Sequence, residues 1–270
     1  MANTGKQNEG GDWLAWNRTA WDRQVDRGNR WTVPVDDEAV ERARAGDWSI
    51  VLTPAKPVPR SWFPTSLEGV EILALASGGG QQATVLAAAG ANVTLLDNSP
   101  RQIEQDRKLC ERHGLEIRAE QGDMRDLSRF EQGQFDLCVH PSSNTFVPDP
   151  EPVWNEAARV LRPGSVLMSG FLQPAFWIFD EDKALKGELV VRHSIPYADE
   201  EALTPEELKK LRDEDEPLCF GHSFDSLLGG QCRAGFVIED MFEDEMDERP
   251  LDRHLPSMMA TKSRLRANQP

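Results

Sequence analysis

A glycine-rich segment is the first candidate for chemistry in this sequence. Ser77-Gly78-Gly79-Gly80 follows the apolar run 70–76 and precedes the alanine-rich run 81–90. Glycine costs conformational entropy, so a cluster of glycines indicates a loop that needs positive φ or close approach of the backbone to a ligand. Between a strand and a helix, such a loop presents N–H groups that bind nucleotides. Taken alone, the pattern also fits a tight turn with no further role.

A carboxylate stands at the end of the next apolar run. Asp97 closes the predicted strand 91–97, and a carboxylate in this place accepts hydrogen bonds from both hydroxyls of a ribose. The geometry serves NAD and S-adenosylmethionine equally. The two elements together predict an adenosine-containing ligand and leave the choice between these two molecules open. Asp106, the other aspartate of the same predicted helix region, is expected at the surface.

The elements that must position these residues follow a regular alternation. Runs typical of strands lie at 70–76, 91–97, 115–121, 134–140 and 165–172, and helical patterns lie at 81–90, 99–114 and 152–164. Strands that alternate with helices at this spacing predict a parallel sheet with helices on both faces. Two further strands, at 237–244 and 257–265, are expected to close the domain, and a strand is expected at 186–197.

The segment before the first strand is unusually aromatic. Six of the eight tryptophans precede residue 63, and Trp13, Trp16 and Trp21 form an apolar stripe on a predicted helix. Such a stripe serves core packing more often than ligand contact. We nevertheless expect residues 13–64 to be a helical lid and linker, after a disordered tail at 1–12. The catalytic domain is expected at 65–270, with an inserted cap at about 175–220.

Three further motifs carry a family resemblance. "QGDMRDL" (121–127), "HPSSN" (140–144) and "VLRPGSVLMSG" (160–170) follow in the order of the predicted strands. This succession resembles the class I S-adenosylmethionine-dependent methyltransferases over most of the chain. With "AWDRQVDRGNRWTVPV" and "LASGGGQQ", it is similar to a bacterial subgroup that methylates small molecules. The resemblance implies an α/β, Rossmann-like, seven-stranded doubly wound sheet with an antiparallel last strand, an N-terminal helical lid and an insertion after strand five.

The resemblance also implies a cofactor site. Asp123 would take the adenine amino group and the Met124 N–H would meet the adenine ring. The full expected set is Trp31, Ala76, Ser77, Gly78, Gly80, Gln82, Asp97, Asn98, Gln102, Gly122, Asp123, Met124 and His140. The acidic residue that usually holds the methionine ammonium group is replaced by Ala74. Backbone carbonyls near Ala76, or the side chains of Ser77 or His140, are expected to take over that contact.

Methyl transfer from a sulfonium is an in-line displacement, which needs chiefly a correctly placed acceptor and the exclusion of water. A base is needed only when the acceptor arrives protonated. His140 and Tyr197 are the candidate catalytic residues. Asn29, Asn144, His193 and Tyr197 are the candidate acceptor-binding residues. Each of them could instead make structural hydrogen bonds, and the acceptor itself stays open between a thiol, an amine, a phenol and a carboxylate.

Composition narrows the partners. A net charge of -16 argues against binding a nucleic acid backbone. The chain has neither an apolar run long enough for a membrane nor a signal peptide, so we expect a cytoplasmic monomer or homodimer. The four cysteines are widely spaced, which predicts free thiols and no metal, although a metalloid site from Cys138, Cys219 and Cys232 stays open. The competing functions are an NAD-dependent oxidoreductase and a non-catalytic S-adenosylmethionine-binding protein.

Overall fold

The structure, a computed structural model, describes residues 13–246 and 249–267, and it is built on one large sheet. The strand order is β3-β2-β1-β4-β5-β9-β8. The strands are β1 (Glu71–Leu75), β2 (Asn92–Asp97), β3 (Arg118–Gln121), β4 (Phe135–His140), β5 (Leu161–Leu172), β8 (Phe236–Asp244) and β9 (Met258–Leu265). β1 to β5 pair in parallel, and β9 runs antiparallel to both β5 and β8. The predicted seven-stranded α/β sheet with an antiparallel last strand is confirmed.

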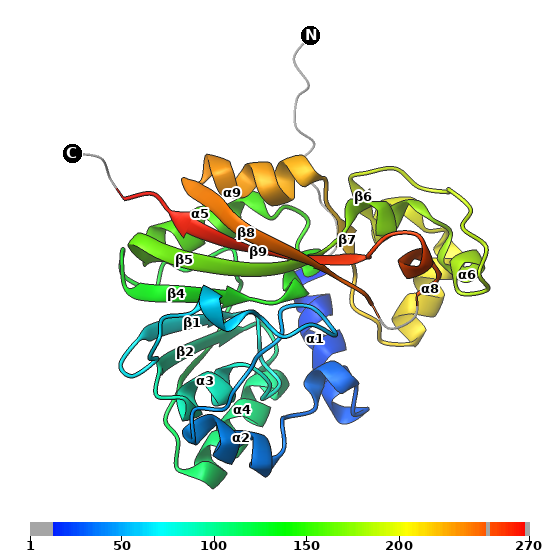
Figure 1. Cartoon of the computed structure of the whole chain (residues 1–270). Helices are drawn as coiled ribbons and strands as arrows, with labels where there is room; N and C mark the ends of the chain where they lie inside the picture. Colours follow the sequence, from blue (N-terminus) through cyan, green and yellow to red (C-terminus); the bar gives the residue numbers. More distant parts are fainter. Residues whose placement is uncertain (1–12, 247–248, 268–270) are drawn as a thin grey trace.

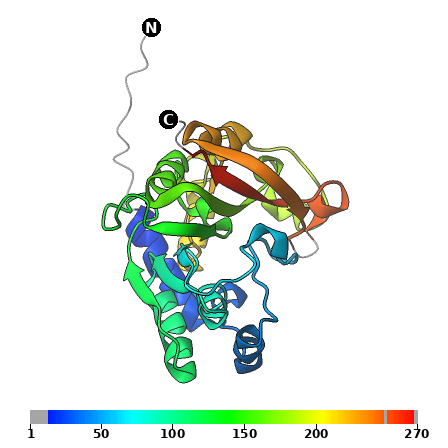
Figure 2. The ribbon, with the colours of Figure 1, turned by 60° about the vertical axis from the view of Figure 1, so that its left-hand side comes forward.

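Helices cover both faces of this sheet, as the alternation predicts. On one side lie α2 (Asp37–Arg44), α3 (Ala83–Ala88) and α4 (Pro100–His113), and on the other lie α5 (Glu151–Val160) and α9 (Gly230–Arg233) (Figures 1 and 2). The side chains of β1 alternate between two cores, because successive strand residues point to opposite faces. Ile72 and Ala74 join the core under α3, whereas Leu73 and Leu75 join the core under α5.

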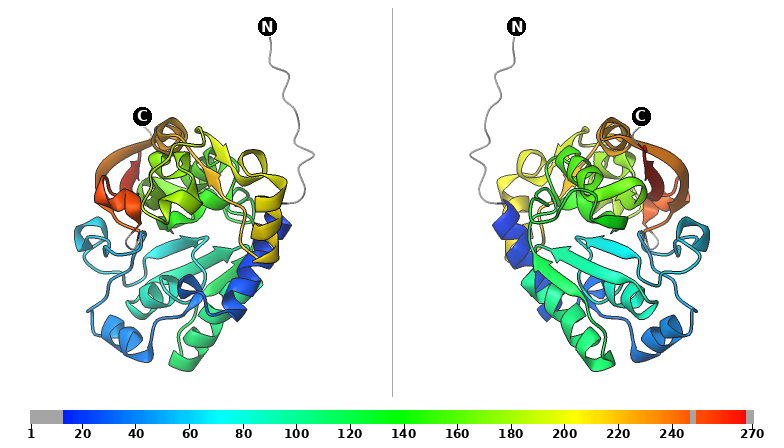
Figure 3. Two further views of the ribbon diagram at one scale, coloured as in Figure 1. Left: turned by 90° about the vertical axis from the view of Figure 1, so that its right-hand side faces the viewer. Right: turned by 90° about the vertical axis from the view of Figure 1, so that its left-hand side faces the viewer.

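The tryptophan-rich N-terminal segment divides between core and site. α1 (Trp13–Asp26) lies beyond the carboxyl ends of the parallel strands, beside the helix α8 (Pro205–Asp213) (Figure 3). After α1 come the 3₁₀ turns η1 (Arg30–Thr32) and η2 (Arg60–Trp62). Trp48 and Trp62 are core residues. The predicted tail 1–12 lies outside the described residues.

The segment between β5 and β9 carries short elements. They are η4 (Pro174–Ile178), α6 (Glu181–Ala184), β6 (Tyr197–Ala198), α7 (Asp199–Ala202), α8, β7 (Phe220–Gly221), η5 (Asp225–Gly229) and, after β8, η6 (Pro250–Arg253). The strand predicted at 186–197 was wrong, because only Val191 bridges to Phe179 and only Tyr197–Ala198 joins a two-stranded sheet. Val190 and Val191 are exposed, so their β-branched side chains are not packed in a sheet.

The helix α8 begins with a side-chain cap. The Thr204 hydroxyl accepts the Glu207 N–H and the Glu207 carboxylate accepts the Thr204 N–H, which together form a capping box. In the part of the chain that the structure describes, no helix is long and apolar enough to cross a membrane.

Candidate active site

A cavity of about 250 Å³ opens where the parallel strands end. Its walls include Ala76 after β1, Asp97 at the end of β2, Gly122 after β3 and Pro141 after β4. The carboxyl ends of parallel strands form the edge at which open α/β sheets bind their ligands. α1 covers this edge with Trp13, Leu14, Asn17 and Trp21, and η1 adds Trp31.

The glycine loop that follows β1 has the positive φ angles that its composition predicts. Gly79 and Gly80 adopt φ of 111° and 77°, and Ala76 adopts a φ of 49°, which is uncommon for a residue with a side chain. A Cβ on Gly78 would lie 2.7 Å from the Gln102 Cβ and 3.0 Å from the Asp97 Oδ2. The loop therefore has no space for a side chain at Gly78, and it passes directly beside the Asp97 carboxylate.

A buried carboxylate on α4 holds this loop. Asp106 Oδ2 accepts the N–H groups of Gly79 and Gly80, each at 2.9 Å, and the side chain is 0% exposed. Burial raises the pKa of this carboxyl to about 7. The expectation that Asp106 lies at the surface was wrong. The signal was available, because Asp106 falls on the stripe of Ile103 and Cys110 that faces the core.

Asp97 stands at the tip of β2 with hydrogen-bonding capacity left over. Its Oδ2 accepts the Gly78 N–H and its Oδ1 accepts the Ser99 N–H, both at 2.9 Å. A carboxylate has about four acceptor positions, so each of its two oxygens can accept one further hydrogen bond. Burial is the largest influence on its pKa and raises it above the ordinary value.

Asp123 is fixed by a neighbouring arginine that also contacts α1. The Arg125 guanidinium donates to the Asp123 carboxylate from Nε at 3.0 Å and from a terminal nitrogen at 2.6 Å. The same guanidinium lies 4.5 Å from the centre of the Trp13 ring. The Asp123 carboxylate therefore keeps one orientation, and that orientation is coupled to the position of α1.

Two polar atoms in the cavity wall lack partners. The Ser77 Oγ and the Gln102 Oε1 are buried and have no hydrogen bond within the described ranges. Buried polar atoms in proteins are nearly always bonded, so unpaired ones on residues that line a cavity are candidates for contact with a polar ligand.

Comparison with known proteins identifies the family. A family described as "Methyltransferase domain" matches residues 73–169. The chain is 48% identical over 250 residues to a protein of Bacillus subtilis (strain 168) that bears the name "Uncharacterized methyltransferase YbaJ", covering 93% of this chain and 97% of the relative. This chain is an S-adenosylmethionine-dependent methyltransferase of class I. The family prediction made from the motifs is confirmed.

Solved structures agree with this methyltransferase in fold. An S-adenosylmethionine-dependent methyltransferase from Mesorhizobium loti aligns with a TM-score of 0.57 at 18% identity, covering 76% of this chain and 94% of its own. A second one, from Methanosarcina mazei, gives a TM-score of 0.55 at 20% identity, with coverages of 77% and 96%. At these identities the likeness supports the fold alone.

The cofactor of the methyltransferase is S-adenosylmethionine, as predicted, and the cavity residues fit it. The unpaired Ser77 Oγ and Gln102 Oε1 suit the zwitterionic amino acid portion of this cofactor. At Gly78 a side chain would collide with Gln102 and Asp97, so the loop presents only backbone atoms there. The predicted residues that line the cavity are Trp31, Ala76, Ser77, Gly78, Gln82, Asp97, Asn98, Gln102, Gly122, Asp123 and Met124.

Six predicted site residues are not among those that line the cavity: Asn29, Gly80, His140, Asn144, His193 and Tyr197. Gly80 packs against Pro34 and supports the loop through Asp106. Asn29 caps η1, where its Oδ1 accepts the Trp31 N–H at 3.0 Å. Both residues therefore shape the cavity from behind its wall.

His140 lies beneath the cavity floor. Alternation along β4 places it on the same face as Cys138, where its ring packs edge-on against Trp154 with centroids 5.8 Å apart. Its Nδ1–H donates to the Leu75 carbonyl at 3.0 Å, and burial lowers its pKa to about 4. Fully buried and neutral, His140 is not placed to act as a base in this cavity.

Asn144 is structural as well. Its side-chain amide donates to the Gly170 carbonyl at 2.7 Å, and its main-chain carbonyl accepts a hydrogen bond from His222 Nε2 at 2.9 Å. It belongs to the turn η3 (Ser142–Phe146), whose other members do reach the cavity. Asn144, predicted to bind the acceptor, is the one residue of η3 that is not among those lining the cavity.

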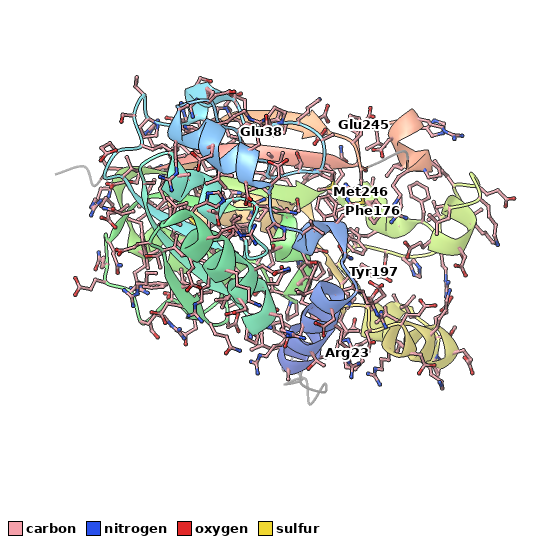
Figure 4. All side chains as sticks on the ribbon, turned by 90° about the horizontal axis from the view of Figure 1, so that it is seen from below. Arg23, Glu38, Phe176, Tyr197, Glu245 and Met246 are labelled. Carbon is pink, nitrogen blue, oxygen red and sulfur yellow. The ribbon has the colours of Figure 1, made fainter. Side chains whose placement is uncertain are left out.

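Tyr197 and His193 form a separate cluster in the insertion. The Tyr197 ring stacks on Trp177 with centroids 5.2 Å apart, and its hydroxyl donates to the Asp199 Oδ1 at 2.8 Å. His193 meets the Tyr197 ring edge-on. Burial raises the pKa of Asp199 to about 6. Figure 4 labels Tyr197 and Phe176 in the insertion and Met246 in the connection after β8. Met246 lines the cavity, whereas Tyr197 and Phe176 are not among the lining residues.

Four residues at or beside the cavity were not among the predicted site residues: Asn17, Arg125, Met246 and Met258. Asn17 lies between Trp13 and Trp21 on the stripe of α1, and a polar residue in an apolar stripe is a usable signal. Its amide donates to the carbonyls of Leu218 and Phe146, and its Oδ1 accepts the Leu218 N–H at 2.7 Å. The two methionines carry no local signal, because their role depends on where the last strands fold.

The three cysteines of the alternative metalloid site lie in different parts of the structure. Cys138 is buried in the core under α5, Cys219 is partly buried in the insertion, and Cys232 is exposed on α9. Across the described ranges, no group of three or more His, Cys, Asp or Glu side chains is arranged to hold a metal ion.

Proposed function

We propose that this methyltransferase transfers a methyl group to a small-molecule acceptor by in-line displacement. The observation that carries the proposal is the set of apolar residues that share the cavity wall with the predicted cofactor residues: Val51, Leu52, Pro54, Phe146, Val147, Leu172, Met246 and Met258. We assign the part of the cavity that these eight residues line to the acceptor, and call it the acceptor space. An apolar space next to a cofactor site suits an organic acceptor.

The chain's own residues would divide the cofactor between them. Asp97, with one acceptor position left on each oxygen, would hold the ribose hydroxyls, and Asp123 would hold the adenine amino group. Ser77 and Gln102 would contact the methionine portion, replacing the acidic residue absent at Ala74. When bound, the cofactor supplies an electrophilic methyl group on a sulfonium.

The remaining task is to exclude water, and α1 is suited to it. Asn17 ties α1 to the insertion and to η3, while the Ser99 hydroxyl donates to Asp22 at 2.6 Å. The Asn98 side chain also donates to the Leu14 carbonyl at 2.9 Å. We infer that α1 and η1 form a lid, which must open to admit the ligands and then closes over them.

Product analysis tests this function. The purified protein is incubated with S-adenosylmethionine and a panel of small apolar acceptors, and both S-adenosylhomocysteine and methylated acceptor are measured by mass spectrometry. Asp97→Asn is expected to lower turnover at least tenfold at limiting cofactor, whereas Asp182→Asn on exposed α6 keeps the wild-type rate. Equal rates for wild type and Asp97→Asn would contradict the proposed cofactor contact. Cofactor binding without transfer to any acceptor would favour the non-catalytic binding protein.

A further inference from the structure

The wall of the acceptor space carries no titratable side chain. Among the described residues, the eight that surround it are aliphatic, aromatic, proline or methionine side chains. The carboxylates that do line the cavity are Asp97 and Asp123, and both belong to the cofactor side. The proposed function assigns the remaining acceptor positions of Asp97 to the ribose hydroxyls, and Asp123 is paired with Arg125. Neither is available as a base for the acceptor.

The hydroxyl groups beside this space are committed as donors. Ser142 donates to the Leu52 carbonyl at 2.9 Å and Ser143 donates to the Ala76 carbonyl at 2.6 Å. Thr145 donates to the Phe220 carbonyl at 3.2 Å, and Thr53 donates to the Asp244 carboxylate at 2.7 Å. A hydroxyl has one proton to give, so these four oxygens can only accept from a ligand.

An oxyanion would find no cationic side chain in this cavity wall. A carboxylate or phenolate buried away from water needs several hydrogen-bond donors or a cation, and an unpaired one is costly. The described lining contains no lysine, arginine or histidine. An alkylammonium or a phenol would have to lose a proton first, and no described side chain stands ready to take it.

Charge balance favours a different nucleophile. When an anionic acceptor reacts with a sulfonium, opposite charges cancel and the products are neutral at the reacting atoms. In an apolar space, where charges attract strongly and are poorly solvated, this cancellation is favourable. A neutral nitrogen acceptor would instead leave a cation in the apolar space. Among the possible anionic acceptors, a thiolate loses the least hydration free energy when it leaves water. A thiol is also partly ionised at neutral pH and intrinsically very nucleophilic.

Building on the proposed function, we propose that the acceptor is a neutral, mostly apolar thiol that reacts as its thiolate. The thiol proton passes to solvent before closure. The thiolate sulfur then forms a bond to the methyl carbon as the bond from that carbon to the sulfonium sulfur breaks. The electron pair of the broken bond stays on the departing sulfur, giving S-adenosylhomocysteine and a methyl thioether. Met246 and Met258, whose side chains carry polarisable thioethers, line the same cavity.

Four acceptors with the same ring test the proposal: phenylmethanethiol, benzyl alcohol, benzylamine and benzoate. We expect methylation of the thiol at least a hundredfold faster than of the other three. Calorimetry on the protein loaded with S-adenosylhomocysteine gives an independent readout, in which the thiol binds at least tenfold more tightly than the alcohol. Faster methylation of the alcohol, amine or carboxylate would overturn the thiol assignment and leave the proposed function standing.

The pH profile distinguishes a thiolate acceptor from an enzyme base. An aromatic thiol that ionises below neutral pH and an aliphatic thiol that ionises above it are compared at limiting acceptor. The midpoint of kcat/KM should move with the pKa of each thiol, and Asp123→Asn should leave that midpoint in place. A midpoint common to both thiols would reveal an enzyme base and overturn the proposal. If S-adenosylmethionine binds but neither thiol is methylated, the thiol proposal also fails. If S-adenosylmethionine does not bind at all, the proposed function itself is contradicted.

Discussion

The Asp106 carboxylate on α4 accepts the backbone N–H of Gly80 at 2.9 Å, from a position with no exposure to solvent. The same oxygen accepts the N–H of Gly79. A buried side chain thus fixes the loop that forms the cofactor wall, from the side opposite to the cavity. The arrangement stabilises the positive φ angles of both glycines, and it places a second carboxylate near Asp97, whose charge contributes to the raised pKa of Asp106.

The first prediction concerns stability and pH. The pKa of Asp106 is about 7 in the folded protein and about 4 in the unfolded chain, so between these values the folded form holds a proton that the unfolded form has released. The stabilisation that comes from this raised pKa is fully present below pH 4 and is lost as the pH rises to 7. Asp106→Asn does not titrate, so its free energy of unfolding relative to wild type should rise across this window, by on the order of 1 kcal/mol per pH unit.

Urea unfolding of wild type and Asp106→Asn at several pH values measures this difference, because the other groups cancel. Asp106→Ala serves as the comparison, since it leaves two buried N–H groups unpaired and should cost about 2–4 kcal/mol. A constant difference between the Asn variant and wild type from pH 4 to pH 8 would show that Asp106 does not titrate in this window.

The second prediction concerns Gly78. Alanine there would press its Cβ against Gln102 and the Asp97 carboxylate, so Gly78→Ala should lower stability by about 1–3 kcal/mol and weaken S-adenosylhomocysteine binding at least tenfold. Gly229→Ala is the control, because its Cβ would meet only the flexible ends of Arg233 and Asp225. Calorimetry and thermal unfolding of both variants decide the matter. Normal affinity in Gly78→Ala would mean that the loop backbone is not part of the cofactor wall.

The third prediction concerns the contact between Arg125 and Trp13. The ring faces a guanidinium that also orients Asp123, so the two residues should act as one unit in cofactor binding. In a double-mutant cycle with Arg125→Met and Trp13→Ala, the S-adenosylhomocysteine affinities should show a coupling of about 0.5–1 kcal/mol. Additive effects would separate α1 from the adenine side of the site.

The fourth prediction concerns Asn17. Removing its side chain leaves buried groups of Leu218 and Phe146 unpaired, so Asn17→Ala should cost about 1–3 kcal/mol and loosen α1. Hydrogen exchange should become faster in 13–26 and in 216–220, and slow again when S-adenosylhomocysteine binds. Thr19→Ala, on the exposed side of α1, is the control. Unchanged exchange in Asn17→Ala would show that α1 does not depend on this contact to stay closed.

Local sequence signals predicted which residues meet at the cavity. The loop 77–80 and Asp123 follow strands and Asp97 ends one, and strand ends meet at one edge of a parallel sheet. His140 was predicted by the same rule, but the rule does not say which face of the strand a terminal residue occupies. Alternation from Cys138 would have placed His140 under α5, since successive residues point to opposite faces.

The acceptor side depends on tertiary packing and could not be predicted in the same way. Met246 and Met258 reach the cavity only because β8 and β9 fold back along β5. Tyr197 was a candidate because its residue type suits catalysis, yet its hydroxyl is held by Asp199 in the insertion. The aromatic stripe of α1 gave the correct helix, whereas its docking across the strand ends rests on long-range contacts such as Asn17 with Leu218.

Calorimetric titration of the intact protein with S-adenosylhomocysteine measures whether Asp97 holds the cofactor, with NAD as the comparison ligand and Asp97→Asn as the variant. We expect one S-adenosylhomocysteine bound per chain, no measurable heat with NAD, and an affinity lowered about tenfold or more by Asp97→Asn, because hydrogen bonds to a charged group are lost. An Asp97→Asn variant that binds S-adenosylhomocysteine as tightly as wild type, or a wild-type protein that binds NAD instead, would contradict this expectation.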